Sequence, residues 1–299
     1  MSLTCLLLIT IVNYNVENLF HPAHDSVAGE PKEDMEWTLE GERRWSYTRY
    51  YRKEENIARV LTNIGEWDGV DVVGLEEIEN AAVVKRLCYT LRRGEYDFVH
   101  YESPDRRGID VALIYKKARI DTISTGVLRV SGLGVSGLEE LKTRDILYVC
   151  AQVDKQDTIH FFVCHLSSQR GGKAESAWKR EAAKNVLEQA IDSVYSVDPQ
   201  AKIIVMGDMN EDGMKIKGLK DERMKGEGTH KYQGRWTFLD HFYVSPSLDS
   251  LSNAYVYDAE WIQETDEKYM GLKPKRTYNG FTYQNGFSDH LPIVLQCLK

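Results

Sequence analysis

Short apolar runs alternate with amphipathic stretches along the whole chain. Runs rich in Val, Ile, Phe and Tyr that are bounded by Gly, Asp, Lys or Asn are typical of β-strands. They predict strands near 6–14, 70–75, 97–102, 110–116, 123–130, 146–153, 158–165, 202–207, 238–244 and 290–297. The polar residues 154–157 between two of these runs predict a hairpin.

Helical spacing occurs in three segments. Apolar residues recur at positions i, i+3, i+4 and i+7 within 57–64, 84–91 and 183–194. This spacing places the apolar side chains on one face of a helix. Strands and helices do not alternate strictly, so their order favours two packed sheets flanked by helices over a barrel or a doubly wound sheet.

The chain has 299 residues, and no internal repeat or Pro/Gly/Ser-rich linker divides it. We therefore expect a single mixed α/β (α+β) domain over 1–299. Two long polar stretches, 21–50 and 211–235, interrupt the scaffold, and loops of this length usually bear on function.

The apolar start of the chain is too short to span a membrane, and we predict no transmembrane segment. The β-branched residues 9–12 favour a first strand within 1–12, with a vestigial export signal as the alternative. The sequence leaves open whether the protein is cytoplasmic or exported. We infer no obligate protein partner.

Composition is that of an ordinary globular protein, with 42% hydrophobic residues. Lys and Arg number 38 against 46 Asp and Glu, a net charge of −8 that argues against a protein gripping duplex DNA through a basic surface. It does not exclude a nuclease, because a metal ion and a few arginines can hold phosphate. The five cysteines form no CxxC pair, so we expect buried thiols rather than a zinc site or a disulfide scaffold.

Polar residues gather directly after the apolar runs. Carboxylates, amides and histidines stand in six segments, 14–20, 72–80, 163–168, 203–210, 237–241 and 287–292. A single Asp or Asn after a strand is more often a turn former or a helix cap. Six such segments in one chain, which include Gly-Asp-x-Asn and Ser-Asp-His, favour a common site at the sheet edges.

Converging strand ends would bring oxygen ligands together. The candidates are Asn15, Glu77, Asp208 and Asp289. Hard oxygen donors favour Mg²⁺ or Mn²⁺ over zinc.

Two histidines, His165 and His290, would transfer protons or stabilise charge, and Asp240 could orient one of them. Metal-assisted hydrolysis of a phosphoester requires such a set. The Gly-rich residues 132–137 match GxGxxG, but the residues before the next strand leave room for barely two helical turns. This segment predicts a flexible loop rather than a dinucleotide site.

In this order, the six segments resemble the endonuclease/exonuclease/phosphatase superfamily, whose members share the DNase I-like fold. The resemblance runs from Asn15 to Leu295 and is most specific at 207–210 and 288–290. The segment 107–113 adds to it. The resemblance implies a four-layered sandwich of two mixed sheets with helices outside, a divalent metal, usually Mg²⁺, and direct attack of water on phosphorus.

The resemblance also implies a ligand set. Glu77 is expected to be the principal metal ligand, with Asn15 beside it and Asp289 as a further ligand. Many members carry Gln at the position of Glu76, which we expect to point away from the metal.

Catalytic roles follow from the same resemblance. Asp208 would orient or deprotonate the attacking water, and Asn210 would fix that geometry or hold a phosphate oxygen. His290, held by Asp240, would stabilise charge on the phosphoryl group or act as acid or base. His165 would lie near the leaving group.

Arginines are the expected substrate contacts, because a guanidinium matches phosphate bidentately. Arg107 and Arg170 are the first candidates, although an ordinary surface role is the alternative for each. Lys275 and Arg276 are weaker candidates of the same kind.

Together these observations predict a divalent-metal-dependent phosphoester hydrolase. Cleavage of a phosphodiester in nucleic acid or in a phospholipid head group is the first expectation. Release of phosphate from a sugar or inositol phosphate is the second. The sequence lacks the basic DNA-gripping loops of many family nucleases, which counts against duplex DNA. A non-catalytic binding protein on the same scaffold is the rival from another class.

Overall fold

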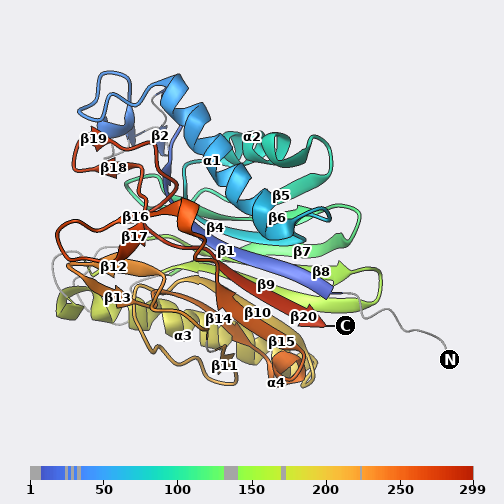
Figure 1. Cartoon of the computed structure of the whole chain (residues 1–299). Coiled ribbons are helices and arrows are strands. Elements are labelled where there is room, and N and C mark those ends of the chain that lie inside the picture. Colours follow the sequence, from blue (N-terminus) through green and yellow to red (C-terminus); the bar gives the residue numbers. More distant parts are fainter. Residues whose placement is uncertain are drawn as a thin grey trace.

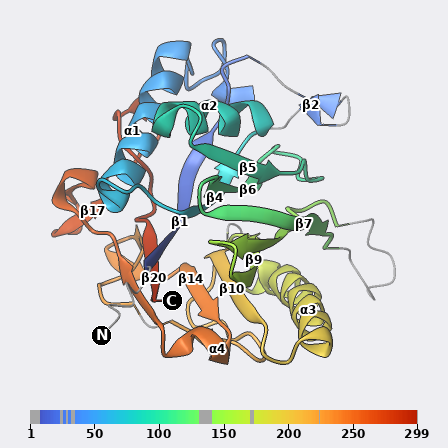
Figure 2. The ribbon, with the colours of Figure 1, turned by 90° about the vertical axis from the view of Figure 1, so that its right-hand side faces the viewer.

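The apolar runs of the sequence form two six-stranded mixed sheets that pack face to face (Figure 1). The computed structural model describes residues 8–23, 26–27, 30–31, 35–130, 141–169, 173–222 and 224–298. Helices cover the outer face of each sheet, so the layers follow the order helix, sheet, sheet, helix (Figures 1 and 2). This arrangement confirms the predicted mixed α/β fold class.

The first sheet has β1 and β4 at its centre. Its strand order is β15 (Ser252–Val256), β20 (Ile293–Leu298), β1 (Leu8–Leu19), β4 (Val72–Ile78), β6 (Asp110–Lys116) and β5 (Tyr96–His100). β1 and β4 run parallel, whereas the other neighbours pair antiparallel.

The second sheet repeats this plan around β9 and β10. Its order is β11 (Lys220–Asp221), β14 (Asp240–Val244), β10 (Lys202–Asp208), β9 (Asp157–His165), β8 (Ile146–Val153) and β7 (Ile120–Leu128). β9 and β10 are its parallel pair. β8 and β9 form the antiparallel hairpin that residues 154–157 predict.

Alternation along the strands divides the apolar side chains between two cores. On β10, Ile204 and Met206 join the core between the sheets, whereas Ile203 and Val205 pack beneath α3 (Lys173–Val197). Successive side chains of a strand point to opposite faces, so a continuous apolar run is what a strand buried on both faces requires. α1 (Tyr47–Gly65) and α2 (Ala81–Arg92) cover the first sheet.

Short elements complete the chain at the sheet ends. They are η1 (Met35–Trp37), α4 (Pro246–Asp249), η2 (Glu260–Ile262) and the two-stranded pairs β2 (Ser26–Val27) with β3 (Glu30–Pro31), β12 (His230–Tyr232) with β13 (Arg235–Thr237), β16 (Gln263–Thr265) with β17 (Leu272–Pro274), and β18 (Tyr278–Asn279) with β19 (Thr282–Tyr283). In the part of the chain that the structure describes, no helix is both long and apolar enough to cross a membrane.

The interpretation of 21–50 as a polar loop is partly wrong. This stretch contains η1 and the first turn of α1, and Trp37 and Trp45 are buried within it. The Trp45 indole N–H donates to the Phe20 carbonyl oxygen at 2.8 Å, which satisfies its polar atom in the core. The GxGxxG segment 132–137 lies outside the described residues.

The cysteine interpretation holds where the structure describes these residues. Cys88, Cys150, Cys164 and Cys297 are free and buried. Cys5 lies outside the described residues.

Candidate active site

The candidate residues meet at the edge where the parallel strands of both sheets end. Asn15 on β1 is in register with Glu76 on β4, and Asp208 on β10 is in register with His165 on β9. The antiparallel strand β14 begins at Asp240, opposite Asp208. Ligand sites in α/β folds form where the carboxyl ends of parallel strands converge, and here two such pairs face each other.

Asp208 is the residue on which both sheets converge. Its Oδ2 accepts a hydrogen bond from Asn15 Nδ2 at 3.2 Å and lies 3.7 Å from His165 Nε2 and 3.9 Å from His290 Nε2. Burial raises the pKa of Asp208 to about 7. The positive charge of His290 lowers this pKa, and the negative charge of Asp240 raises it. A carboxyl group with a pKa near neutrality is suited to orient a water molecule and take its proton.

His290 is held by Asp240, as the sequence predicts. Nδ1 of His290 lies 2.7 Å from Oδ2 of Asp240, and both residues are buried. Burial alone lowers the pKa of His290, but Asp240 and Asp208 outweigh burial and raise the pKa well above its usual value. The ring is therefore a cation at neutral pH, with Nε2–H directed toward Asp208.

His165 differs from His290 in charge. Burial lowers the pKa of His165 well below its usual value, and the positive charges of Arg144 and Arg107 lower it further. Its Nε2 faces two carboxylates, 3.8 Å from Glu77 Oε1 and 3.7 Å from Asp208 Oδ2. This environment favours the neutral tautomer with the proton on Nε2, which can donate to a phosphoryl oxygen.

Glu77 sits in a strained backbone position at the end of β4. Its φ is +63°, and the pairing with β6 shifts register between Glu76 and Ile78. Its Oε2 accepts a hydrogen bond from the Asn18 amide at 3.0 Å. Residues in the left-handed region persist where their surroundings fix them, and they cluster at functional sites.

Asn210 braces Asp208. Its backbone N–H donates to Asp208 Oδ1 at 2.8 Å, and its Nδ2 donates to the Leu166 carbonyl oxygen at 3.0 Å. Its φ of +51° turns the chain sharply after β10. Of the two predicted roles for Asn210, these contacts favour fixing the geometry of Asp208.

Asp289 is paired with Arg276, one of the weaker candidates for a substrate contact. Arg276 Nη2 donates to Asp289 Oδ2 at 2.8 Å, and Arg276 Nε donates to Glu17 Oε1 at 3.1 Å. Burial raises the pKa of Asp289, but Arg276 and His290 outweigh it and lower the pKa to about 2. Asp289 and Glu17 thus share one guanidinium, and the charges of both, with that of Glu77, raise the pKa of Arg276.

Arg107 lies beside the site, next to Asp105, which was not predicted as a site residue. Arg107 Nε is 3.5 Å from Asp105 Oδ1, and Asp105 Oδ2 accepts from Arg144 Nη1 at 2.9 Å. Arg144 also donates to the carbonyl oxygens of His165 and Leu166. Arg170 lies outside the described residues, so its predicted role stays a prediction.

Several polar residues around the site were not predicted: the buried Glu17, Lys53, Asp105, Arg144 and Thr229, and the partly buried His230. Glu17 stands in the polar segment 14–20, and Asp105 and Arg144 precede strands β6 and β8, so their positions in the sequence could have indicated them. The sequence pattern did not indicate Lys53, because this residue lies on a helix whose other charged side chains are mostly exposed. Its buried Nζ lies 4.0 Å from Glu17 Oε2.

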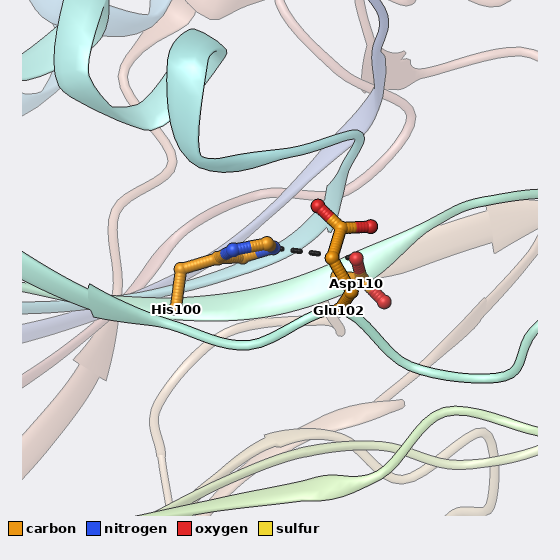
Figure 3. A group of neighbouring side chains, drawn as sticks. All are labelled: His100, Glu102 and Asp110. Carbon is orange, nitrogen blue, oxygen red and sulfur yellow. Dashed lines mark hydrogen bonds and ion pairs between the residues drawn. The ribbon is translucent and has the colours of Figure 1, made fainter. Parts of the chain in front are cut away.

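A second group of acids and imidazole lies where β5 ends and β6 begins, with Glu102 in the loop between them. Figure 3 shows the His100 ring directed toward Asp110, with Glu102 beside them; their ligand atoms lie within 4.8 Å of one another. Asp110 Oδ2 is 3.2 Å from His100 Nε2, and Asp110 Oδ1 accepts from the Ser103 amide at 3.0 Å. These contacts anchor the loop that carries Asp105 and Arg107.

The residues at this edge fit a hard divalent cation. Glu77 Oε1 lies 3.8 Å from His165 Nε2, beyond hydrogen-bond distance, and the Glu77 side chain is 18% exposed. Asn15 Oδ1 accepts the Glu17 amide at 3.0 Å and keeps a second lone pair. Carboxylate and amide oxygens are the ligands that Mg²⁺ and Mn²⁺ prefer.

Comparison with known proteins decides the family. Residues 10–299 match the model of the Endonuclease/Exonuclease/phosphatase family. The chain belongs to this family. Members of the endonuclease/exonuclease/phosphatase family hydrolyse phosphoester bonds, and the protein is a hydrolase of this class. The resemblance noted in the sequence is thereby confirmed. No curated protein sequence matches the chain.

Solved structures of the endonuclease/exonuclease/phosphatase family share the fold at low sequence identity. A family protein from Bacteroides thetaiotaomicron is 17% identical, with a TM-score of 0.64 and 98% of both chains covered. A mannosyl-6-phosphatase from the same organism is 17% identical, with a TM-score of 0.61, 96% of this chain and 98% of that chain covered. TDP2 from Caenorhabditis elegans is 14% identical, with a TM-score of 0.63, 98% of this chain and 75% of that chain covered.

Proposed function

We propose that the protein is a divalent-metal-dependent phosphoester hydrolase in which water attacks phosphorus directly. The arrangement around Asp208 supports this proposal most strongly. One carboxylate oxygen faces an amide and two imidazoles, which come from both sheets. Such an oxygen can hold an attacking water while its neighbours receive the phosphoryl group.

The metal site of the proposal consists of Glu77, Asn15 and Asp289. The Glu17 amide fixes Asn15, and Arg276 fixes Asp289, so the side chains are positioned before any cation binds. When bound, Mg²⁺ or Mn²⁺ would withdraw charge from the phosphoryl oxygens. The strained turn at Glu77 holds this carboxylate at the sheet edge.

The two histidines have different roles in the proposal. The cationic His290, held by Asp240, offsets negative charge that develops on the phosphoryl group. The neutral His165 donates its Nε2–H near the leaving group. Asp208 takes the proton of the attacking water, and Asn210 keeps its carboxylate in place.

A phosphodiester is the first expected substrate of this site. Release of phosphate from a sugar phosphate is the second candidate, which the likeness to a mannosyl-6-phosphatase favours. A panel of substrates tests both, with Mg²⁺, Mn²⁺ or EDTA. It contains plasmid DNA, single-stranded RNA, sphingomyelin, inositol polyphosphates, mannose 6-phosphate, bis-p-nitrophenyl phosphate and p-nitrophenyl phosphate.

Metal-dependent turnover that is absent from Glu77→Gln supports the proposed hydrolase, and the best substrate selects between diester and monoester. Equal turnover with EDTA and with Mg²⁺ would contradict the metal-dependent mechanism. Absence of turnover together with absence of any Mg²⁺-linked stabilisation would favour the rival, a binding protein on the same scaffold.

A further inference from the structure

A polar cavity of about 220 Å³ opens beside the candidate active site. Its charged lining comprises four cations and one carboxylate: Arg107, Lys142, Arg144, Lys179 and Asp105. The hydroxyl-bearing residues Thr143, Ser167, Ser168 and Ser176 complete the polar lining. In a chain with a net charge of −8, such a local excess of positive charge marks a place where an anion is stabilised.

The cavity lies next to the end of β9, where His165 stands. Ser167 and Ser168 follow His165 in the chain, and Arg144 donates to the His165 and Leu166 carbonyl oxygens at 3.1 and 2.7 Å. The cavity therefore opens beside the backbone segment that carries His165 out of β9.

Asp105 positions the two arginines without neutralising the cavity. Its Oδ2 accepts from Arg144 Nη1 at 2.9 Å, and its Oδ1 is 3.5 Å from Arg107 Nε. A guanidinium has five N–H donors, and the three bonds of Arg144 to Asp105, His165 and Leu166 leave two for another acceptor. Lys142 is exposed and Lys179 half-buried, so both ammonium groups can reach a ligand.

We propose that this cavity binds a second phosphoryl group of the substrate, so that the enzyme prefers small phosphoesters carrying two phosphate groups close together. This inference rests on the proposed hydrolase function and adds its substrate class. A small molecule is favoured over a nucleic acid, because the positive charge is confined to one cavity of limited volume in an acidic chain.

Two matched pairs of substrates test the proposal with Mg²⁺ present. The first pair is p-nitrophenyl thymidine 5′-phosphate with and without a 3′-phosphate. The second is glucose 1,6-bisphosphate against glucose 6-phosphate. In whichever pair is hydrolysed, we expect the doubly phosphorylated member to have a KM lower by about tenfold or more, the size of one charge-assisted contact.

Lys142→Gln and Lys179→Gln test whether the cavity causes the lower KM of the doubly phosphorylated substrate. Each substitution should raise KM for the doubly phosphorylated member by about tenfold and change kcat little. KM for the singly phosphorylated member should rise by a much smaller factor. The control is Lys85→Gln, an exposed lysine on α2. This substitution should leave KM unchanged for both members of each pair.

The outcomes separate the two proposals. Hydrolysis of both members with equal KM, or equal effects of the lysine substitutions on both, would overturn the second-phosphate site and leave the hydrolase intact. Absence of metal-dependent hydrolysis of every substrate, together with absence of any Mg²⁺-linked stabilisation, would refute the proposed function itself. If the substitutions impair cleavage of an oligothymidylate far more than that of either small pair, the cavity follows a nucleic acid backbone and the small-molecule assignment is wrong.

Discussion

His290 Nδ1 lies 2.7 Å from Asp240 Oδ2 in a buried pair that joins the strand β14 to the segment before β20. Thr229 connects the same two segments, since its Oγ1 accepts from the Asp240 amide at 3.3 Å and its carbonyl oxygen accepts from the Leu291 amide at 2.8 Å. The imidazole is therefore fixed in orientation as well as in charge.

Asp240→Asn should lower kcat by about 10²- to 10⁴-fold and leave KM within a small factor. The amide keeps the shape of the carboxylate but removes the charge that raises the pKa of His290. Steady-state kinetics and circular dichroism measure the effect on catalysis and on the fold. A raised KM at unchanged kcat would instead make His290 a contact to the bound substrate.

Glu77→Gln should abolish turnover and remove the stabilisation by Mg²⁺. A cation at about 100 times its Kd stabilises the native state by about 2.7 kcal/mol, which thermal unfolding detects as a raised Tm. The matched control is Glu55→Gln, whose side chain is 60% exposed on α1. It should keep both properties, and full Mg²⁺-dependent activity in Glu77→Gln would refute the ligand assignment.

Gly207→Ala should destabilise the fold by more than about 3 kcal/mol. Gly207 precedes Asp208 with φ +148°, and a Cβ there would lie 1.9 Å from the Cys164 carbonyl oxygen. Gly126→Ala is the control, because a Cβ at Gly126 on β7 has no atom within 4 Å. Urea unfolding should show a loss only for Gly207→Ala, and equal midpoints would contradict the close contact.

The stability of the protein should decline as pH rises above about 6.5, in part because of His241. Burial lowers the pKa of His241, but Asp221 and the Phe238 carbonyl outweigh it and raise the pKa. Its ring nitrogens face these two acceptors at 3.2 and 3.1 Å, which only the imidazolium satisfies. A group whose pKa is higher in the folded state stabilises the protein at pH values below its unfolded-state pKa. This stabilisation is lost as the pH rises through the folded-state pKa.

His241→Gln should therefore flatten the pH dependence of unfolding above pH 6.5 or so. His160→Gln serves as the control, because burial lowers the pKa of His160 and its contribution changes below that range. An unchanged slope above this pH in His241→Gln would show that the imidazolium does not contribute.

Strand and helix patterns were sufficient for most of the scaffold. Strands buried on both faces, such as β9 and β10, need continuous apolar runs, and such runs are visible without any tertiary information. β15 was missed because Ser252–Val256 is short and partly polar, and its pairing with β20 decides its conformation. The buried tryptophans of 21–50 were missed because charged neighbours dominate that stretch.

Local pattern and motif were enough to place most strands and helices along the chain, to indicate the family and to pick out the polar residues that end the strands. The partners and charges of those residues depend on how the two sheets pack. The pairing of Arg276 with Asp289, the opposite pKa shifts of His165 and His290, and the cations gathered around Asp105 join residues far apart in the chain. Such shifts arise from burial and from nearby charges, and neither exists until the two sheets pack.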